Sequence, residues 1–530
     1  HIIDWVGVDR LFFSTDYPHW DFDDPRFADE VADQLADWLA ENPPGTGINW
    51  VNTMEVALRA VNWVAVLRTL EPWRPLKDPL RSQITQSLQV HGRHIAANLE
   101  GTPYLRSNHY LSDILGLLVL GATLTGDRDA ERWFLHAHGA FEREITTEVH
   151  DDGVGFEASL SYHALALEIF FLAYTVAARH GQPFSPRFRD RLVRMVEASR
   201  ALRHPDGRLP QFGDSDSGRV LPGGFERGPT LDHLLWLGAA TLDLGRPFPR
   251  EPHEEVAWTL GAEAWQRIAE QPLARPPSRS AFPDSGFYLL KSQRMHVVVR
   301  CGDVGQNGNG GHAHNDLFSF ELSLDTPLII DSGTYVYTSH PQVRNQFRAT
   351  ASHNTVVVAE SEINPMMKTG LFRLKQVAHP HVESWEQTSE RVRLAAWHDG
   401  YRRLSPTVIH RREFVLDRMI DDFEVIDELK GQGRQDARTY IHLSSDTAVT
   451  PTADGAWLVE RGSARCRIHF FGVERVLLDE GWVSDRFGAR QRAPVLVGLV
   501  TGRLPIRFGY RLGPLPVGAE SSAAELAGTT

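Results

Sequence analysis

The sequence contains very little cysteine. Only Cys301 and Cys466 occur among its 530 residues. A framework of several disulfides is therefore excluded, although a single bridge between these two thiols is not. A chain of this length exceeds what one compact core usually organises, so we expect two or three domains held together by hydrophobic packing.

The sequence also lacks features that would direct it to a membrane or to nucleic acid. We find no apolar run long enough to span a bilayer. The formal net charge is −13, which disfavours nonspecific binding to nucleic acid, although an anionic partner is compatible with a local basic cleft. Residue 1 is His and no leader with a basic and then an apolar part is visible, which fits either removal of a signal peptide or a trimmed sequence. We expect a periplasmic or secreted protein. Nothing in the pattern indicates an oligomeric state.

Apolar residues recur at helical spacing through the first half of the chain. Between Asn52 and Leu70 the repeat is carried by Val56, Ala60, Trp63, Val64 and Leu67. Further helices are expected over residues 83–99, 108–125, 129–147, 159–180, 187–203, 230–243 and 255–269. The run from Leu111 to Leu120 is apolar on nearly all sides, as expected of an inner helix sheathed by others. Many helices joined by short polar loops indicate a helical toroid or solenoid.

The pattern changes after a Pro- and Arg-rich linker at residues 271–280. Short β-type runs with turn signals between them follow at residues 287–290, 296–299, 318–324, 356–359, 412–416, 423–426, 439–443 and 495–500. Such runs indicate an antiparallel sandwich. We therefore expect a multidomain α+β protein, with a helical domain over residues 1–272, a β-sandwich over 281–515 and a flexible tail over 516–530.

A glycine-rich polar segment opens the β-rich half, from Gly308 to Asp316. If this segment is extended, His312 and His314 point the same way, because residues two apart on a strand share a face. Asp331 ends the next expected strand, and His353 precedes another. Two histidines and one carboxylate on neighbouring strands suit a divalent metal such as zinc. Hydrogen-bonded histidines at a domain interface are the alternative.

Three polar segments interrupt the helical half. Asn108 and His109 stand at the start of an apolar helix, where polar groups often act only as caps. Tyr162 lies one turn into another helix, within the segment Glu157 to His163, and a core tyrosine with a satisfied hydroxyl is the common case there. The segment Gly213 to Arg219 carries two carboxylates. These carboxylates either hold a loop, pair with an arginine or form a general acid and base pair.

Taken together, six motifs in this order resemble the heparinase II/III-like polysaccharide lyases. They are Ser107-Asn108-His109, Glu157 to His163, Gly213 to Arg219, Gly311 to Asp316, Asp331-Ser332-Gly333 and Phe347 to Thr355. The resemblance covers most of the chain. It implies an N-terminal (α/α) toroid joined to a C-terminal antiparallel β-sandwich. It also implies lytic cleavage of a uronate-containing polysaccharide in the cleft between these domains.

The resemblance implies a role for each matching residue. Asn108, with His109 beside it, would neutralise the substrate carboxylate, Tyr162 would be the catalytic tyrosine, and His312 would face the substrate. The ligands of one divalent ion would be His314, Asp331 and His353. The ion would be zinc, or else manganese or calcium, and would brace the cleft wall rather than activate water. Some relatives add a tyrosine from the β-domain, for which Tyr335 and Tyr337 are both candidates.

Basic and aromatic residues flank these motifs. We expect a substrate-binding set made of Arg59, Trp63, Arg106, His163, Arg344, Arg348 and Tyr337. Arginine binds sulfate and carboxylate through paired contacts, which favours glycosaminoglycans such as heparan sulfate, chondroitin sulfate or hyaluronan. An alginate or bacterial exopolysaccharide lyase is the alternative within the same mechanism. A glycoside hydrolase using Glu157 with Asp214 or Asp216, and a carbohydrate-binding scaffold without turnover, are rival hypotheses from outside that mechanism.

Overall fold

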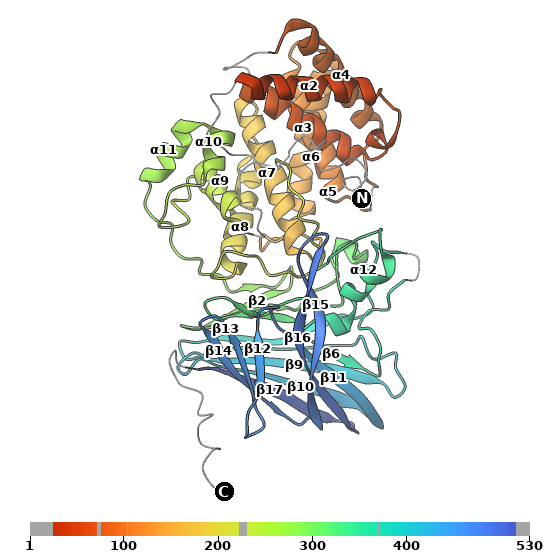
Figure 1. Cartoon of the computed structure of the whole chain (residues 1–530), viewed down its shortest axis with the longest axis vertical. Coiled ribbons are helices and arrows are strands. Elements are labelled where there is room, and N and C mark those ends of the chain that lie inside the picture. The colour runs from red at the N-terminus through yellow and green to blue at the C-terminus, as the bar shows by residue number, and fades with distance from the viewer. Residues whose placement is uncertain (1–24, 71–75, 103, 222–229, 368–369, 516–530) are drawn as a thin grey trace. The chain divides into compact units, whose positions relative to one another are not determined.

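The computed structural model describes residues 25–70, 76–102, 104–221, 230–367 and 370–515 (Figure 1). The expected tail over 516–530 lies outside the described residues. The chain forms two compact units. The helical unit comprises residues 1–201 and 217–278, and the β unit comprises residues 202–216 and 279–530.

The helical unit is an (α/α) toroid built from successive helices. Its described elements are α2 (Pro25–Glu41), η2 (Ile48–Trp50), α3 (Thr53–Leu70), α4 (Asp78–Ala97), α5 (Asn108–Thr123), α6 (Arg128–Thr147), α7 (Leu160–Arg179), α8 (Pro186–Leu202), α9 (Asp232–Leu242), α10 (Glu254–Leu260) and α11 (Ala262–Glu270). Helix α5 packs against α3, α4, α6 and α7, and every residue from Tyr110 to Gly121 is buried. The expectation of an inner helix here is therefore confirmed.

Short polar signals set where these helices begin and end. Asp127 caps α6 by accepting from the backbone N–H groups of Asp129 and Ala130, and Ser159 caps α7 by accepting from Tyr162. The single helix expected over residues 255–269 is wrong. Gly261 has a φ of 98° and separates α10 from α11, because this left-handed conformation cannot continue a right-handed helix.

Helix α7 also corrects the expectation that no apolar run is long enough to span a membrane. Leu160–Arg179 has 20 residues, and an 18-residue window within it has a mean hydropathy of 1.4, which meets that criterion by length and composition. However, 67% of this window is buried inside the protein. A helix that is apolar on all sides is also what the core of a large helical unit requires.

The β unit consists of antiparallel strands. Its elements are β1 (Ala281–Phe282), β2 (Phe287–Lys291), β3 (His296–Arg300), η3 (Gln306–Gly308), β4 (Phe320–Ser323), β5 (Pro327–Ile329), α12 (Pro341–Arg348), η4 (Thr350–Ser352), β6 (Val356–Val358), β7 (Pro380–Gln387), β8 (Arg391–His398), β9 (Val408–Asp417), β10 (Asp422–Gly431), β11 (Arg434–His442), β12 (Ala448–Pro451), β13 (Trp457–Arg461), β14 (Ala464–Phe471), β15 (Arg475–Arg486), β16 (Ala489–Arg503) and β17 (Ile506–Pro514).

These strands form three sheets around one hydrophobic core. The strand orders are β1-β2-β3-β4-β5, β12-β13-β14-β17-β10-β9-β8-β7 and β15-β16-β11-β6. Along β9, buried and half-buried residues alternate strictly, as expected of a strand with one face on the core. Phe320, Phe414 and Tyr510 from different strands lie in that core. The predicted antiparallel sandwich is therefore confirmed.

Two segments of the chain differ from what the sequence predicts. Residues 311–319 form loops and turns rather than a strand, so the argument that His312 and His314 share a strand face is wrong. In addition, residues 202–216 belong to the β unit rather than to the helical domain. The physical reason is a buried anchor: the Glu321 carboxylate accepts from the Gln211 backbone N–H at 2.6 Å and pairs with His204 at 2.9 Å.

Both cysteines, Cys301 and Cys466, are free and buried, so they do not form the single disulfide that the sequence had left open.

Candidate functional site

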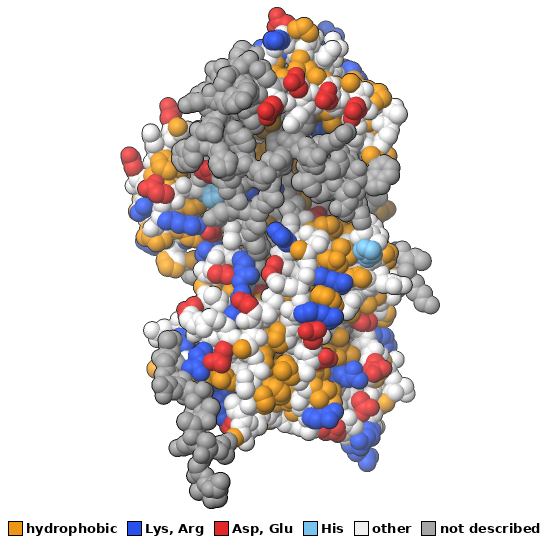
Figure 2. Space-filling view, viewed as in Figure 1, with side chains coloured by type: hydrophobic (Ala, Val, Ile, Leu, Met, Phe, Trp, Pro, Cys, Tyr) orange, Lys and Arg blue, Asp and Glu red, His pale blue; other side chains and the backbone are white. Residues whose placement is uncertain are grey.

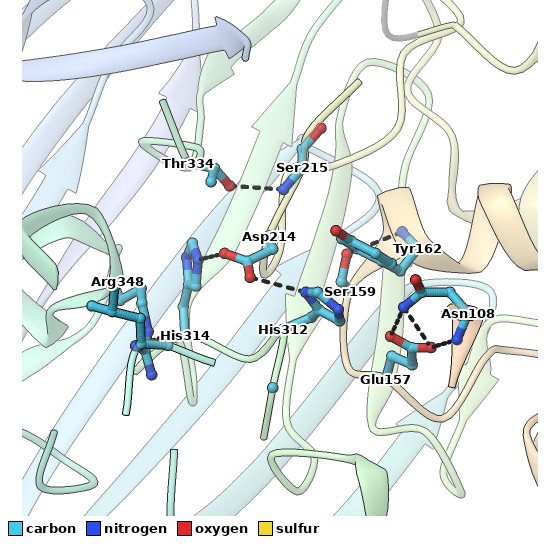
Figure 3. A network of polar contacts seen from close by, with 12 residues as sticks. Asn108, Glu157, Ser159, Tyr162, Asp214, Ser215, His312, His314, Thr334 and Arg348 are labelled. Atoms are coloured by element: carbon cyan, nitrogen blue, oxygen red, sulfur yellow. Dashed lines mark hydrogen bonds and ion pairs between the residues drawn. The ribbon is translucent and has the colours of Figure 1, made fainter. Parts of the chain in front are cut away.

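Asp214 is the centre of a buried polar network in the β unit. Its carboxylate accepts from His312 Nδ1 at 3.0 Å and from His314 Nε2 at 2.9 Å (Figure 3). Arg344 adds a bidentate contact, with both N···O distances at 2.7 Å, and donates its Nε to the Leu371 carbonyl. Two imidazoles and one guanidinium are thereby fixed around one carboxylate.

The electrostatics of this network keep Asp214 ionised. Burial alone would raise the pKa of Asp214, but the Arg344 guanidinium and the two histidine hydrogen bonds hold it well below its usual range. A carboxylate that stays deprotonated and fully buried cannot serve as a general acid. Asp214 instead orients His312, whose side chain is 11% exposed.

The same histidine, His314, belongs to a cluster with metal-ligand chemistry. One ligand atom each from His314, Asp331 and His353 lies within 4.8 Å of the others, and all three residues are buried. Asp214 accepts from His314 Nε2 and Asp331 accepts from His353 Nδ1 at 2.7 Å. His314 Nδ1 and His353 Nε2 are left buried without a hydrogen-bond partner. Two orphaned imidazole nitrogens beside a carboxylate fit a divalent ion.

Asn354 connects the segments of two of these ligands, and it was not predicted as a site residue from the sequence. Its side-chain amide donates to the carbonyls of Phe320 and Ile330, the second of which adjoins Asp331. Its carbonyl oxygen accepts from the His442 backbone N–H at 2.6 Å. No spacing rule predicts these partners, since they lie on strands distant in sequence. The only signal is the place of Asn354 directly after His353.

In the helical unit, Glu157 connects the starts of two helices. Its carboxylate accepts from the Asn108 backbone N–H at 2.9 Å and from the Asn108 amide at 3.0 and 3.2 Å (Figure 3). Two residues later Ser159 caps α7, and Tyr162 stands in the first turn of that helix. Glu157 therefore fixes Asn108 at the start of α5 relative to the segment that carries Tyr162.

His109 lies beside Asn108 and pairs with a different carboxylate. Its Nδ1 is 3.2 Å from Glu100 Oε1, and its side chain is 40% exposed. The hydrogen bond to Glu100 is the main cause that raises the pKa of His109 above its ordinary value. His109 is therefore an accessible imidazole biased toward its cationic form.

Two residues expected to bind substrate in the helical unit have structural roles instead. Trp63 is 3% exposed and packs edge-on against Trp38, so it offers no ring face to a sugar. His163 accepts from the Gly155 backbone N–H and contacts Ser199, and burial lowers its pKa to about 4. These two expectations are wrong because the packing of the core uses the side chains completely.

The expected arginines are also largely engaged inside the protein. Arg59 donates to His91 and stacks over two tryptophan rings, while Arg106 pairs with the buried Glu144 at 2.8 Å. Arg344 and Arg348 are 0% and 1% exposed. Burial lowers the pKa of Arg348 to about 10, and its guanidinium donates to carbonyls of the chain. The expectation that Arg344 and Arg348 contact substrate directly is therefore wrong.

The two candidate tyrosines of the β unit remain half-buried. Tyr337 packs edge-on against Phe372 and Phe487, with centroids 5.1 and 5.0 Å away. Tyr335 has a φ of 66°, which is unusual for a residue with a side chain. Neither ring belongs to the hydrophobic core of the β unit.

The fold and these clusters define a protein with an (α/α) toroid and an antiparallel β-sandwich, each carrying one group of candidate residues. A model of the heparinase II/III N-terminus matches residues 16–222, and one of the heparinase II/III-like C-terminal region matches residues 274–508. The chain belongs to the heparinase II/III-like family.

Individual relatives agree with this assignment. A heparin-sulfate lyase of Bacteroides stercoris is 23% identical over 506 residues, which cover 88% of this chain and 68% of the relative. A heparin-sulfate lyase of Pedobacter heparinus is 23% identical over 499 residues, covering 89% and 68%. Among solved structures, a heparinase III superposes with a TM-score of 0.71 at 16% identity, covering 95% of this chain and 75% of that one.

Proposed function

We propose that this protein is a polysaccharide lyase that cleaves a uronate-containing glycosaminoglycan of the heparan sulfate type by β-elimination. The observation that carries the proposal is the match along 88% of the chain to a heparin-sulfate lyase. The polar groups of both units supply suitable chemistry: a tyrosine and an imidazole with a raised pKa in the helical unit, and a histidine held by a carboxylate in the β unit.

The reaction removes the proton on C5 of the uronate and expels the oxygen on C4. The C5 proton is weakly acidic because the adjacent carboxylate is anionic. Donors or cations placed on that carboxylate stabilise the enolate-like intermediate. A catalytic base must then take the C5 proton, and an acid must return a proton to the departing C4 oxygen.

Tyr162 is the residue proposed to move both protons. An unperturbed tyrosine has a pKa of about 10, so a neighbouring cation or donor must favour its deprotonated form. His109, with its raised pKa, is proposed to carry positive charge to the uronate carboxylate together with Asn108. Glu157 accepts from the Asn108 amide and so fixes its orientation, and one of the two N–H groups of that amide is proposed to donate to the substrate. His312 is proposed to donate from the β unit, oriented by Asp214.

A divalent ion, most suitably zinc, is proposed to be held by His314, Asp331 and His353. Two imidazoles and one carboxylate suit zinc better than calcium. The ion would act as a brace that supplies folding energy. Because Asp214 contacts both His314 and His312, this brace is connected to the proposed substrate-facing histidine by one carboxylate.

The net charge of −13 is not spread evenly over the surface, so some regions can still attract a polyanionic substrate. Figure 2 shows basic and acidic side chains interspersed on the visible face of the β unit. The potential near a substrate therefore depends on local groups within about 8 Å at physiological ionic strength.

The test is an absorbance screen of the purified protein on heparan sulfate, chondroitin sulfate, hyaluronan and alginate. Elimination creates a conjugated C4–C5 double bond, whereas hydrolysis does not. We expect the strongest signal on heparan sulfate. Elimination on alginate alone would overturn the glycosaminoglycan assignment and keep the mechanism. Cleavage without the new absorbance would indicate a hydrolase, which the engagement of Glu157 and Asp214 as hydrogen-bond acceptors disfavours.

A further inference from the structure

The hairpin of β15 and β16 ends in an exposed tip. These strands have 12 and 15 residues. Figure 1 shows the hairpin projecting beyond the sheets of the β unit, on the side that also carries α12. Near the tip, Asp485, Arg486 and Arg490 are exposed. Val483 and Ala493 of the hairpin pack with Ile330 in a buried hydrophobic cluster, whereas the exposed polar side chains of the tip take no part in that packing.

Arg490 is held between two aromatic rings. Its guanidinium carbon lies 4.6 Å from the centroid of Tyr335 and 4.1 Å from that of Trp482. Within the described chain, this exposed guanidinium forms no hydrogen bond or ion pair with a carboxylate. Stacking fixes the plane of the guanidinium, while its five N–H donors stay available in that plane. Arg490 is therefore a preoriented donor without an anion.

A second guanidinium shares the same indole ring. Arg492 is directly opposite Trp482 in the strand register, and its guanidinium carbon is 3.8 Å from that ring centroid. Arg490 and Arg492 are two residues apart on β16, so they project from the same face. Arg492 contacts Glu480 at 3.3 Å, but both side chains are more than half exposed. Such a surface pair is weak and can be exchanged for a ligand.

Backbone contacts tie this tip to the candidate metal segment. The Ser484 N–H donates to the Ser332 carbonyl at 2.9 Å, and the Gly488 N–H donates to the Tyr335 carbonyl at 2.7 Å. Ser332 directly follows Asp331. Tyr335 has a φ of 66°, a strained conformation that surrounding contacts must maintain. The ring beneath Arg490 is therefore fixed relative to the segment that begins at Asp331.

We propose that Arg490 and Arg492, with Tyr335 and Trp482, form a binding site for an oxyanion carried by a sugar. The ligand chemistry is a sulfate or a carboxylate bound by a bidentate guanidinium contact, and the two aromatic rings hold the guanidinium groups in place. The proposal rests on the proposed function, because the site would be an outlying subsite for the anionic polysaccharide. It places two positive charges on a chain whose net charge is −13.

The test compares Arg490→Ala with Arg475→Ala. The control removes the same charge from an exposed position at the other end of β15. Binding to heparan sulfate and to its unsulfated counterpart, heparosan, is measured by titration calorimetry at fixed ionic strength, alongside kcat/KM and the melting temperature. We expect Arg490→Ala to weaken binding about 10-fold, the loss of one charge-assisted contact, and Arg475→Ala to change it less than about 2-fold. Neither variant should melt at a lower temperature.

The two polymers separate the two sources of the oxyanion. A loss on heparan sulfate alone assigns the site to sulfate, and an equal loss on both polymers assigns it to the carboxylate. Arg490→Lys keeps the charge but removes the planar fork, so binding should be intermediate; wild-type binding by this variant would overturn bidentate recognition. Equal effects of Arg490→Ala and Arg475→Ala, or no binding of either polymer by the wild type, would overturn the site. If the wild type binds but produces no unsaturated product, the proposed function fails while the binding comparison still decides the site.

Discussion

The two units hold their candidate residues in different ways. In the β unit, Asp214 accepts from three side chains, and it is itself fully buried along with Arg344 and His314. In the helical unit, Asn108 depends on Glu157, whereas the half-exposed His109 depends on Glu100. The β unit therefore has a shared network, and the helical unit has separate pairs.

This difference determines how far a substitution propagates. Removing one partner from a buried ion pair leaves an uncompensated charge and costs about 3–5 kcal/mol. Removing one partner from an exposed pair typically costs about 1 kcal/mol or less. Substitutions in the helical unit should therefore separate chemistry from stability, and substitutions around Asp214 should change both.

The sharpest separation is expected for Tyr162→Phe. Losing only the hydroxyl should reduce kcat by about 10²–10⁴-fold if Tyr162 transfers the protons. The melting temperature should change little, because the ring keeps its place in α7. Steady-state rates and thermal melts measure both quantities. The matched control is Tyr174→Phe on the same helix, which should keep its rate. Retention of more than about a tenth of the rate, a barrier change below about 1.4 kcal/mol, would remove Tyr162 from this role.

The β unit should respond in the opposite way to Asp214→Asn. This change leaves the buried Arg344 without its carboxylate and should destabilise the unit by about 3–5 kcal/mol. Denaturant unfolding measures the loss. The control is Asp206→Asn in the same segment, because Asp206 pairs with Arg208 near the surface and should cost about 1 kcal/mol or less. Equal losses in the two variants would contradict the picture of a shared network.

Metal content gives a second view of the same network. We expect about one divalent ion per chain in the wild type and none in His314→Ala, measured by elemental analysis. A loss of about 2 kcal/mol would lower the melting temperature by roughly 4–8 °C in a unit of this size. A chelator should lower the melting temperature of the wild type and leave that of His314→Ala unchanged. The exposed His469→Ala is the matched control. Full metal occupancy in His314→Ala would exclude this ligand set.

The sequence predicted those parts of the molecule that depend on local periodicity. The apolar residues of α5 identified it as an inner helix, because they surround the helix on all sides. Runs of β-type residues identified strands such as β3 and β9, because residues close together in the sequence show which faces of a strand are buried. The motifs also placed His314, Asp331 and His353 in one group, and the structure brings them within 4.8 Å. Here the resemblance to a family contributed more than spacing did.

The sequence failed where a partner is distant in the chain. Asp214 was expected to anchor a loop, to pair with an arginine or to act as a hydrolase acid, but the arginine was not identified, because the contact with Arg344 spans 130 residues. Trp63 and His163 were expected to contact substrate, but they pack against Trp38 and Ser199, which are distant in the sequence. The residues next to Trp63 and His163 in the sequence do not indicate this burial. A charged or aromatic residue beside a motif does not reveal whether it points to solvent or to a buried partner.

The smallest expected effect concerns the pair of His109 and Glu100. The hydrogen bond raises the pKa of His109, so its stabilisation is complete below the unfolded value of about 6.5 and is lost as pH rises through the folded pKa. Burial alone would raise the pKa of Glu100, but the hydrogen bonds of its carboxylate outweigh burial and lower this pKa. The stabilisation of the protein by the Glu100 carboxylate is therefore lost as pH falls through the pKa of Glu100 in the folded state.

The pair should therefore stabilise the helical unit only between roughly pH 4 and a limit above roughly pH 6.5. Asp113 and Glu157 also favour the cationic His109, so Glu100→Gln should reduce this effect without removing it. We expect His109→Gln to lower stability by less than about 1 kcal/mol near pH 6, because the side chain is 40% exposed, and to match the wild type near pH 9. Melting curves across this range measure the difference. A deficit that persists unchanged at pH 9 would mean that packing, not charge, holds His109 in place.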